Sequence, residues 1–247
     1  MIGSMMDITD RKQSERMKSD FVSFVSHQLR TPLSGMNWML ELAADAEGLP
    51  DDARMHISDA RESATRLATL VNDLLDIAKL ESGRLSAVPE PLLLSALTRS
   101  VVAEMQPLVN DKALTLEVTC DPSVRPVFAD SQLLRQVVAN LLSNAVKYTP
   151  PDGRIAVNLA QRNGAVTWSV RDTGVGVPEG AQARLFEKFF RAHNAMSMDA
   201  EGTGLGLHLV RLIVEQAGGR VWCESEEGQG ATFAFTLPAM SAEKEEL

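Results

Sequence analysis

The feature that most constrains the fold is an apolar stripe that repeats at alternating three- and four-residue steps between residues 57 and 78. Its members are Ile57, Ala60, Ala64, Leu67, Val71, Leu74 and Ala78. Leu70, Leu75 and Ile77 widen the stripe on both flanks. Each large apolar side chain contributes roughly 1.5–3 kcal/mol only when it leaves water. The pattern therefore predicts a long amphipathic helix that packs against more than one neighbour.

A second helical pattern precedes this one, from about residue 11 to residue 46. The segment Glu47–Pro50 interrupts it, and Asp51 or Asp52 is expected to cap the helix that follows. Together the two helices predict a hairpin, and a lone hairpin cannot cover both flanks of the stripe. We expect two chains to pair into a dimeric four-helix bundle. The alternative is a hairpin that docks on the rest of its own chain.

A histidine stands out on the first predicted helix, in the segment SHQLRTPL at residues 26–33. The neighbouring apolar residues Val22, Val25 and Leu29 define a heptad seam, which leaves His27 facing solvent. Pro32 has no N–H to bond the carbonyl of Gln28, so the helix should loosen beside His27. These residues alone leave two interpretations, a chemically active histidine and an ordinary surface histidine.

The composition of the chain is that of a globular protein, with 45% hydrophobic and 23% charged residues among 247. A formal net charge of −9 argues against a general nucleic-acid binder, which needs a basic face. No apolar run approaches the roughly 20 residues that span a bilayer, so the segment is expected to be soluble and cytoplasmic. Cys120 and Cys223 match no metal-ligand spacing and read as free thiols in a reducing compartment.

A proline-rich connector divides the chain. We expect a linker from an upstream sensor over residues 1–15, the helical domain over 16–84, a connector over 85–91, a second domain over 92–239 and an acidic tail over 240–247. In the second domain, helical patterns cover residues 92–111, 131–147, 180–190 and 204–217. Strand patterns cover 114–119, 154–160, 165–170, 220–224 and 231–237. This order predicts an α+β sandwich with a mixed, mostly antiparallel sheet.

Three groups of residues in the second domain point to a nucleotide. The first group is Asn140, Asn144 and Lys147, which share one face of a predicted helix at four- and three-residue steps. Amide oxygens are hard ligands suited to Mg²⁺, and a neighbouring lysine suits phosphate oxygens. The alternative is a polar helix face without a ligand.

The second group follows a predicted strand, where Asp172 precedes a turn containing Gly174 and Gly176. A carboxylate fixed at that point can accept a hydrogen bond from an exocyclic amine such as that of adenine. A simple Asx turn would explain the same residues equally well.

The third group is a loop with glycines at positions 202, 204 and 206, which opens a predicted helix. Glycines allow the backbone to approach a polyphosphate, and the helix N-terminus offers free N–H groups. The spacing differs from the dinucleotide fingerprint, and the Gly-Lys-Ser/Thr ending of a Walker loop is absent. Residues 186–191 precede this loop with Lys188 and Arg191, followed by a polar, Met-rich stretch. We expect a mobile lid with cations at its base.

The order of these motifs resembles that of sensor histidine kinases. The matching blocks are those around His27, Asn140 and Asn144, Asp172, Phe186–Arg191, Gly202–Gly206 and Gly228–Thr232. The resemblance implies a dimerisation and phosphoacceptor domain, followed by an ATP-binding domain of the fold shared with gyrase and Hsp90-type ATPases. It also implies ATP-dependent autophosphorylation and transfer of the phosphoryl group to an aspartate in a response-regulator receiver domain.

Carried over residue by residue, the resemblance makes His27 the phosphoacceptor and Asp172 the residue that recognises adenine. It gives ATP and Mg²⁺ as ligands, with further contacts assigned as follows. Asn140 and Asn144 bind metal and phosphate, Lys147 and Arg191 neutralise phosphates, Tyr148 packs beside the adenine, and Thr232 supports its polar edge. Lys188, at the base of the lid, is a further residue expected to contact the nucleotide. The remaining pocket and lid positions are Gly174, Gly176, Gly202, Thr203, Gly204, Leu205 and Gly206.

One position departs from the family pattern. The residue after the histidine is usually acidic, whereas here it is Gln28, whose amide cannot take a proton at ordinary pH. We expect autophosphorylation to persist at a lower rate. Thr31 matches the position that supports dephosphorylation of the partner, although its hydroxyl could equally bond back to the helix. Two other functions remain open, a non-catalytic ATP-binding scaffold, which Gln28 favours, and a nucleotide-driven ATPase clamp.

Overall fold

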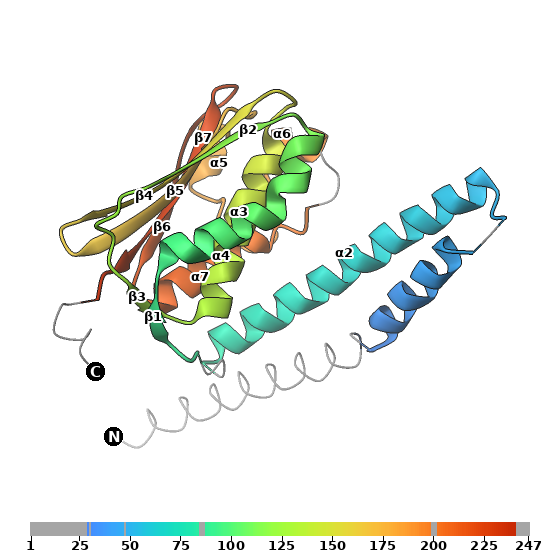
Figure 1. Ribbon diagram of the computed structural model, residues 1–247, viewed down its shortest axis with the longest axis horizontal. Helices are drawn as coiled ribbons and strands as arrows, with labels where there is room; N and C mark the ends of the chain where they lie inside the picture. The colour runs from blue at the N-terminus through green and yellow to red at the C-terminus, as the bar shows by residue number, and fades with distance from the viewer. Residues whose placement is uncertain (1–28, 30, 47, 84–86, 199–201, 241–247) are drawn as a thin grey trace, which may run out of the picture. The chain divides into compact units, whose positions relative to one another are not determined.

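A computed structural model describes residues 29, 31–46, 48–83, 87–198 and 202–240. The chain divides into two compact units, residues 1–86 and residues 87–247, which Figure 1 shows in blue to cyan and in green to red. His27 and Gln28 lie outside the described residues. Among the helices that are described, none combines the length and apolar character needed to cross a membrane.

The first unit contains the predicted helical hairpin. Residues 31–44 form one helix, and α2 (Asp51–Glu81) forms the other. The helix begins after Pro50, and neither predicted aspartate is the N-cap, because Asp51 and Asp52 already lie in the first turn. The buried residues of the two helices are Leu33, Ala64, Val71, Leu75 and Ile77. The apolar stripe of α2 thus supplies part of the core, as its spacing predicts.

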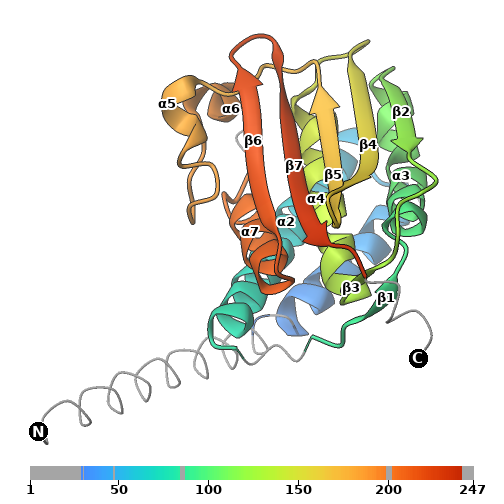
Figure 2. The ribbon, with the colours of Figure 1, turned by 90° about the vertical axis from the view of Figure 1, so that its left-hand side faces the viewer.

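The second unit is a two-layer sandwich with a five-stranded sheet in the order β2-β4-β5-β7-β6. The strands are β2 (Thr115–Cys120), β4 (Arg154–Arg162), β5 (Ala165–Asp172), β6 (Arg220–Glu226) and β7 (Gly230–Pro238). Only the β2–β4 pair is parallel, which confirms the prediction of a mixed, mostly antiparallel sheet. Helices α3 (Leu94–Asp111), α4 (Ser131–Tyr148) and α7 (Gly206–Gln216) cover one face of the sheet (Figure 2).

The core of this sandwich lies between the sheet and the three helices. Trp168 on β5 is fully buried and stacks on Phe235 of β7, with ring centroids 5.4 Å apart. The Trp168 indole N–H donates to the Thr98 hydroxyl on α3 at 3.0 Å, which satisfies a buried donor. Alternate residues of β5 are buried, so the other face of that strand points away from the helices.

Three local features differ from the sequence prediction. Residues expected in a connector form β1 (Glu90–Leu92), which pairs with β3 (Val127–Ala129) in a separate two-stranded sheet. The prediction of a helix over residues 180–190 is wrong beyond α5 (Glu179–Gln182). After α5 the chain turns, and Phe189 adopts a φ of 60°. Part of the expected lid forms the short helix α6 (His193–Met198).

Candidate functional site

Helix α4 carries the first group of predicted site residues. Its N-cap Asp130 accepts hydrogen bonds from the backbone N–H groups of Gln132 and Leu133 at 3.0 and 3.1 Å. The second carboxylate oxygen of Asp130 accepts from the N–H of Val88 at 3.0 Å. One face of α4 is buried in the sandwich through Leu134, Val137, Val138, Leu141, Leu142, Ala145 and Val146. Asn140, Asn144 and Lys147 are half-buried on the remaining face.

The glycine loop approaches this face of α4. A Cβ atom added at Gly206 would lie 2.5 Å from Oδ1 of Asn140, so the glycine leaves room for the Asn140 side chain in its present position. The amide nitrogen of Asn140 donates to the carbonyl of Gln136 at 3.1 Å, which leaves its oxygen toward Gly206. The structure therefore brings Asn140 to the N-terminus of α7, where free backbone N–H groups attract anions.

Asp172 ends β5 with only 4% of its surface exposed. Burial raises the pKa of its carboxyl, although the N–H groups of Gly174 and Ala231 donate to Oδ1 at 2.8 and 3.3 Å and favour the ionised form. No donor among the described residues bonds Oδ2. One oxygen is thus fixed by backbone groups, and the other is available to a ligand with an amine.

The turn after Asp172 packs against the end of α4. A side chain at position 174 would collide with the carbonyl of Tyr148, and one at position 176 would collide with the carbonyl of Glu226. The N–H of Val175 donates to the Tyr148 carbonyl at 3.4 Å. Within α4 itself, the Lys147 ammonium lies 5.4 Å from the centre of the Tyr148 ring. These contacts place Tyr148, Lys147 and the Asp172 turn together at the end of α4.

Backbone contacts hold the glycine loop against the segment that precedes α6. The N–H of Phe189 donates to the Gly204 carbonyl at 2.9 Å, and Gly204 has a φ of 71°. The Thr203 hydroxyl accepts from the N–H of Leu205, which is fully buried. These bonds fix Phe189 against the loop, while the residues between α5 and Phe189 form turns with bonds such as that from the N–H of Glu187 to the Arg184 carbonyl.

The two cations near the lid have different surroundings. The Arg191 guanidinium donates to the carbonyls of Gly202 and Ala195, at 3.1 and 3.4 Å, so it contacts the backbone of the glycine loop and of α6 itself. Lys188 is exposed in the preceding turn. Helix α6 is in turn linked to the Asp172 turn, because the side-chain amide of Asn194 donates to the Gly176 carbonyl at 3.0 Å.

The structure does not bring Thr232 to the Asp172 carboxylate. Thr232 pairs with Arg171 on one side and Glu224 on the other, and all three lie on the sheet face away from the helices. Its neighbour Ala231 faces inward and donates its backbone N–H to Asp172 instead. Sequence patterns gave no sign of this donor, because the register of β5 and β7 that aims it at Asp172 is seen only in the structure.

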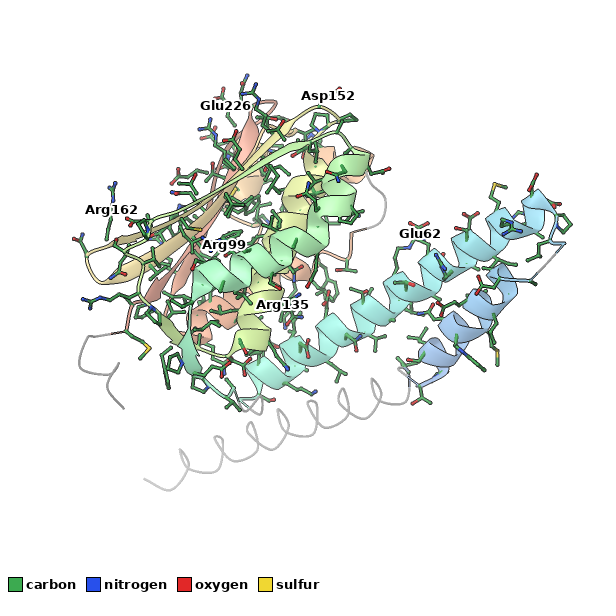
Figure 3. All side chains as sticks on the ribbon, in the orientation of Figure 1. Glu62, Arg99, Arg135, Asp152, Arg162 and Glu226 are labelled. Atoms are coloured by element: carbon green, nitrogen blue, oxygen red, sulfur yellow. The ribbon has the colours of Figure 1, made fainter. Side chains whose placement is uncertain are left out.

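The predicted residues of the second unit otherwise form one continuous set. Contacts run from Asn140 to the glycine loop, from that loop to Arg191 and α6, and from α6 to the Asp172 turn and the end of α4. In Figure 3, the labelled residues Asp152 and Glu226 mark this end of the sheet, and Arg162 marks the other. In the first unit, Thr31 lies exposed on the helix of residues 31–44.

The oxygen ligands of this set are amides and one buried carboxylate. Among the residues that the structure describes, no three His, Cys, Asp or Glu side chains lie close enough to hold a metal ion. A divalent cation at Asn140 and Asn144 would therefore take most of its ligands from phosphates and water, which suits Mg²⁺. The arrangement fits a nucleotide that arrives with its own metal.

Two families match the two units. The family described as His Kinase A (phospho-acceptor) domain matches residues 17–83. The family described as histidine kinase-, DNA gyrase B- and HSP90-like ATPase matches residues 129–241. The matches follow the order that the motifs predict.

Relatives match both units together. The chain is 37% identical over 226 residues to the sensor protein DivL of Caulobacter vibrioides, which covers 92% of this chain and 29% of DivL. The solved structure of full-length ShkA, a complex with AMPPNP, has a TM-score of 0.75 at 33% identity and covers 90% of this chain and 46% of ShkA.

A third relative is matched over almost its whole length. The mycobacterial sensor histidine kinase MprB has a TM-score of 0.53 at 31% identity, over 61% of this chain and 97% of the MprB chain. The chain spans less than a third of the length of DivL. From the two family matches, these relatives and the site geometry, the chain belongs to the sensor histidine kinases and contains the two domains of their kinase core.

Proposed function

We propose that this chain binds ATP, phosphorylates itself on His27 and passes the phosphoryl group to an aspartate of a response regulator. The observation that carries the proposal is the buried carboxylate of Asp172, held by two backbone N–H groups against the end of α4. This geometry gives a base-recognition group a fixed position relative to Asn144 and Lys147. Both are residues suited to the polyphosphate.

ATP is assigned by the chemistry at each part of the site. Oδ2 of Asp172 accepts a hydrogen bond from the exocyclic amine of adenine, while Tyr148 lies beside the adenine ring. Asn140 and Asn144 supply hard oxygens to Mg²⁺, which neutralises phosphate charge when bound. Lys147 and Arg191 supply positive charge, and the N-terminus of α7 supplies backbone donors to the phosphates. The complex of the related ShkA with AMPPNP supports this choice of nucleotide.

The phosphoryl transfer needs little activation of the nucleophile. The ordinary pKa of histidine leaves a ring-nitrogen lone pair free at neutral pH. That nitrogen of His27 forms a bond to the γ-phosphorus, the bond from phosphorus to the bridging oxygen breaks, and ADP leaves. The proton on the other ring nitrogen goes to solvent. Catalysis then rests on positioning and charge neutralisation.

Gln28 and Thr31 would modulate this reaction. An amide next to the histidine can orient the imidazole by a hydrogen bond but cannot accept its proton, so we propose a slow autophosphorylation. Thr31 lies exposed one turn after His27 in sequence, which suits a hydroxyl that orients a water for dephosphorylation of the response regulator.

The active form would be a homodimer. Exposed apolar side chains on the hairpin support this assignment: Leu29, Met36, Met39, Leu67 and Leu74. Leu67 and Leu74 belong to the heptad stripe of α2, yet they are 47% and 37% exposed in the single chain. A second hairpin would cover them and complete a four-helix bundle. We further propose that an upstream sensor controls the core, and that the core works in the cytoplasm, where ATP is available.

The test is labelling of the full chain with [γ-³²P]ATP and Mg²⁺. We expect label that is acid-labile and base-stable in the wild type, and none in His27→Ala or Asn144→Ala. His56→Ala serves as the matched control, because His56 is exposed on α2 outside the proposed site, and it should label normally. Label that survives His27→Ala would contradict the assigned phosphoacceptor.

A non-catalytic ATP-binding scaffold is the second candidate, and Gln28 is the observation that favours it. The same experiment separates the two. A wild-type chain that binds ATP in calorimetry but takes up no label on any residue would support the scaffold and reject the kinase.

A further inference from the structure

The C-terminus of α4 poses a hydrogen-bonding problem. In a continuing helix, the carbonyls of Val146 and Lys147 would accept from the N–H groups of residues 150 and 151. Both of those residues are prolines, Pro150 and Pro151, which have no N–H. The helix must therefore end here, and its last carbonyls need donors from elsewhere.

Lys112 supplies the missing donors. This residue follows the last residue of α3, and its side-chain ammonium donates to the carbonyls of Val146 and Lys147 at 3.0 and 2.9 Å. A third, longer bond of 3.3 Å reaches the carbonyl of Thr149. One ammonium thus replaces two absent amides, and its positive charge lies at the negative end of the helix dipole.

The other two terminal carbonyls of α4 are bonded as well. Ala145 accepts from both the N–H and the hydroxyl of Thr149, at 3.1 and 2.6 Å. Tyr148 accepts from the N–H of Val175 in the Asp172 turn. The end of α4 is therefore held on one side by Lys112 and on the other by the turn that follows Asp172.

The main chain of Lys112 strengthens the same link. Its carbonyl accepts from the N–H of Asp152, in the turn that connects α4 to β4, at 3.2 Å. Side chain and main chain of one residue therefore hold both the last turn of α4 and the loop after it. The last turn carries Lys147 and Tyr148, and Asn144 lies one turn earlier.

We infer that Lys112 is a positioning residue of the ATP site: it sets the distance between the α4 residues that meet the phosphates and the Asp172 carboxylate that meets the base. The inference rests on the proposed function, since it concerns how that site binds ATP. Without the ammonium, two carbonyls lose their donors and the last turn of α4 must shift or fray to reach water. A shift there moves Lys147 and Tyr148 relative to Asp172.

The experiment is isothermal calorimetry of ATP with Mg²⁺ on the full chain, at a temperature where near-ultraviolet circular dichroism shows every variant folded. We expect Lys112→Met to raise the Kd about tenfold or more. Lys112→Arg keeps several charged donors and should bring the Kd back toward the wild-type value. Lys112→Gln keeps an uncharged donor and should lie between the two.

Arg162→Met is the matched control. It removes one exposed positive charge at the far end of β4, and we expect it to bind ATP as the wild type does (Figure 3). If Lys112→Met does not fold, the graded order of Lys112→Gln and Lys112→Arg still tests the inference.

Three outcomes would overturn the inference, and they differ in meaning. If Lys112→Met loses stability but keeps the wild-type Kd for ATP, then Lys112 makes a structural contact only. Where Lys112→Met does not fold, the same result with Lys112→Gln has the same meaning. An equal loss of affinity in Arg162→Met would show a general effect of net charge. A wild-type chain that binds no ATP would reject the proposed function itself, and this inference with it.

Discussion

The side-chain oxygen of Asn140 lies 2.5 Å from the point where a Cβ atom of residue 206 would be, so any side chain at position 206 would force Asn140 to move where α4 meets α7. This contact joins a residue predicted to bind metal and phosphate to the helix N-terminus predicted to bind phosphate. The close approach of α4 and α7 therefore shapes the candidate site as well as the fold.

Gly206→Ala should weaken ATP binding about tenfold or more, because the added methyl group displaces the Asn140 side chain or pushes α7 away. We expect a loss of about 1–3 kcal/mol in the free energy of unfolding as well. Calorimetry of ATP binding and urea denaturation measure the two effects. Gly180→Ala is the control, since nothing lies within 4 Å of its added Cβ. Equal affinities of Gly206→Ala and wild type would contradict the prediction.

Asp172→Asn should abolish measurable ATP binding without loss of stability. The amide oxygen can still accept hydrogen bonds from the N–H groups of Gly174 and Ala231, so the new NH₂ group takes the place of Oδ2. It then faces the adenine amine, and two donors cannot form a hydrogen bond.

Because burial raises the pKa of Asp172, its ionisation opposes folding, and the stability it contributes in acid is lost as pH rises through the folded-state pKa. Asparagine cannot ionise, so Asp172→Asn does not lose stability in this way as pH rises.

Urea denaturation of Asp172→Asn between pH 4 and pH 8 checks this sign, and Asp111→Asn, an exposed acid at the end of α3, is the control. A variant that unfolds more easily than the wild type at pH 8 would show that the carboxylate stabilises the fold rather than the ligand complex.

The hairpin has a pH dependence of its own at Asp73. Burial, and then the nearby charge of Asp76, raise the pKa of Asp73 from 3.8 to about 6. A raised carboxyl pKa means that Asp73 favours folding below about pH 4 and that this contribution is lost as pH rises through 6. Asp73→Asn should therefore raise the melting temperature at pH 7.5 more than at pH 4.5, as measured by circular dichroism at 222 nm. A larger gain at pH 4.5 would reverse the sign and refute the assignment.

Gln28→Glu should increase the initial rate of autophosphorylation, because a carboxylate beside His27 can accept the proton that an amide cannot. The wild type should retain a measurable rate. Single-turnover labelling over the first minutes measures both. A wild-type rate of zero, restored in the variant, would instead mean that Gln28 switches the reaction off.

The sequence predicted the long, regular elements because each carries many periodic positions. The heptad stripe of α2 and the alternating strands β4, β5 and β7 are of this kind. Strands β1 and β3 have three residues each, too few for a period to show, and β1 contains Pro91. The helix expected over 180–190 ends at Gln182, and Phe189 further along bonds the Gly204 carbonyl, a tertiary contact that local propensity does not predict.

The candidate site shows the same division. Side chains such as Asp172, Asn140 and Lys147 could be found from residue type and spacing. The N–H of Ala231 could not, since every residue except proline has one and only the fold aims it at a carboxylate. The inward or outward direction of Thr232 depends on strand register, which a single sequence leaves open.

The carboxylate of Asp130 touches two parts of the chain at once. One oxygen caps the first turn of α4, and the other accepts from the N–H of Val88, two residues before β1, the first strand of the second unit. The chain enters this unit through that segment. The Asp130 carboxylate therefore ties the segment through which the chain enters this unit to the first turn of α4, whose last turn carries Lys147 and Tyr148.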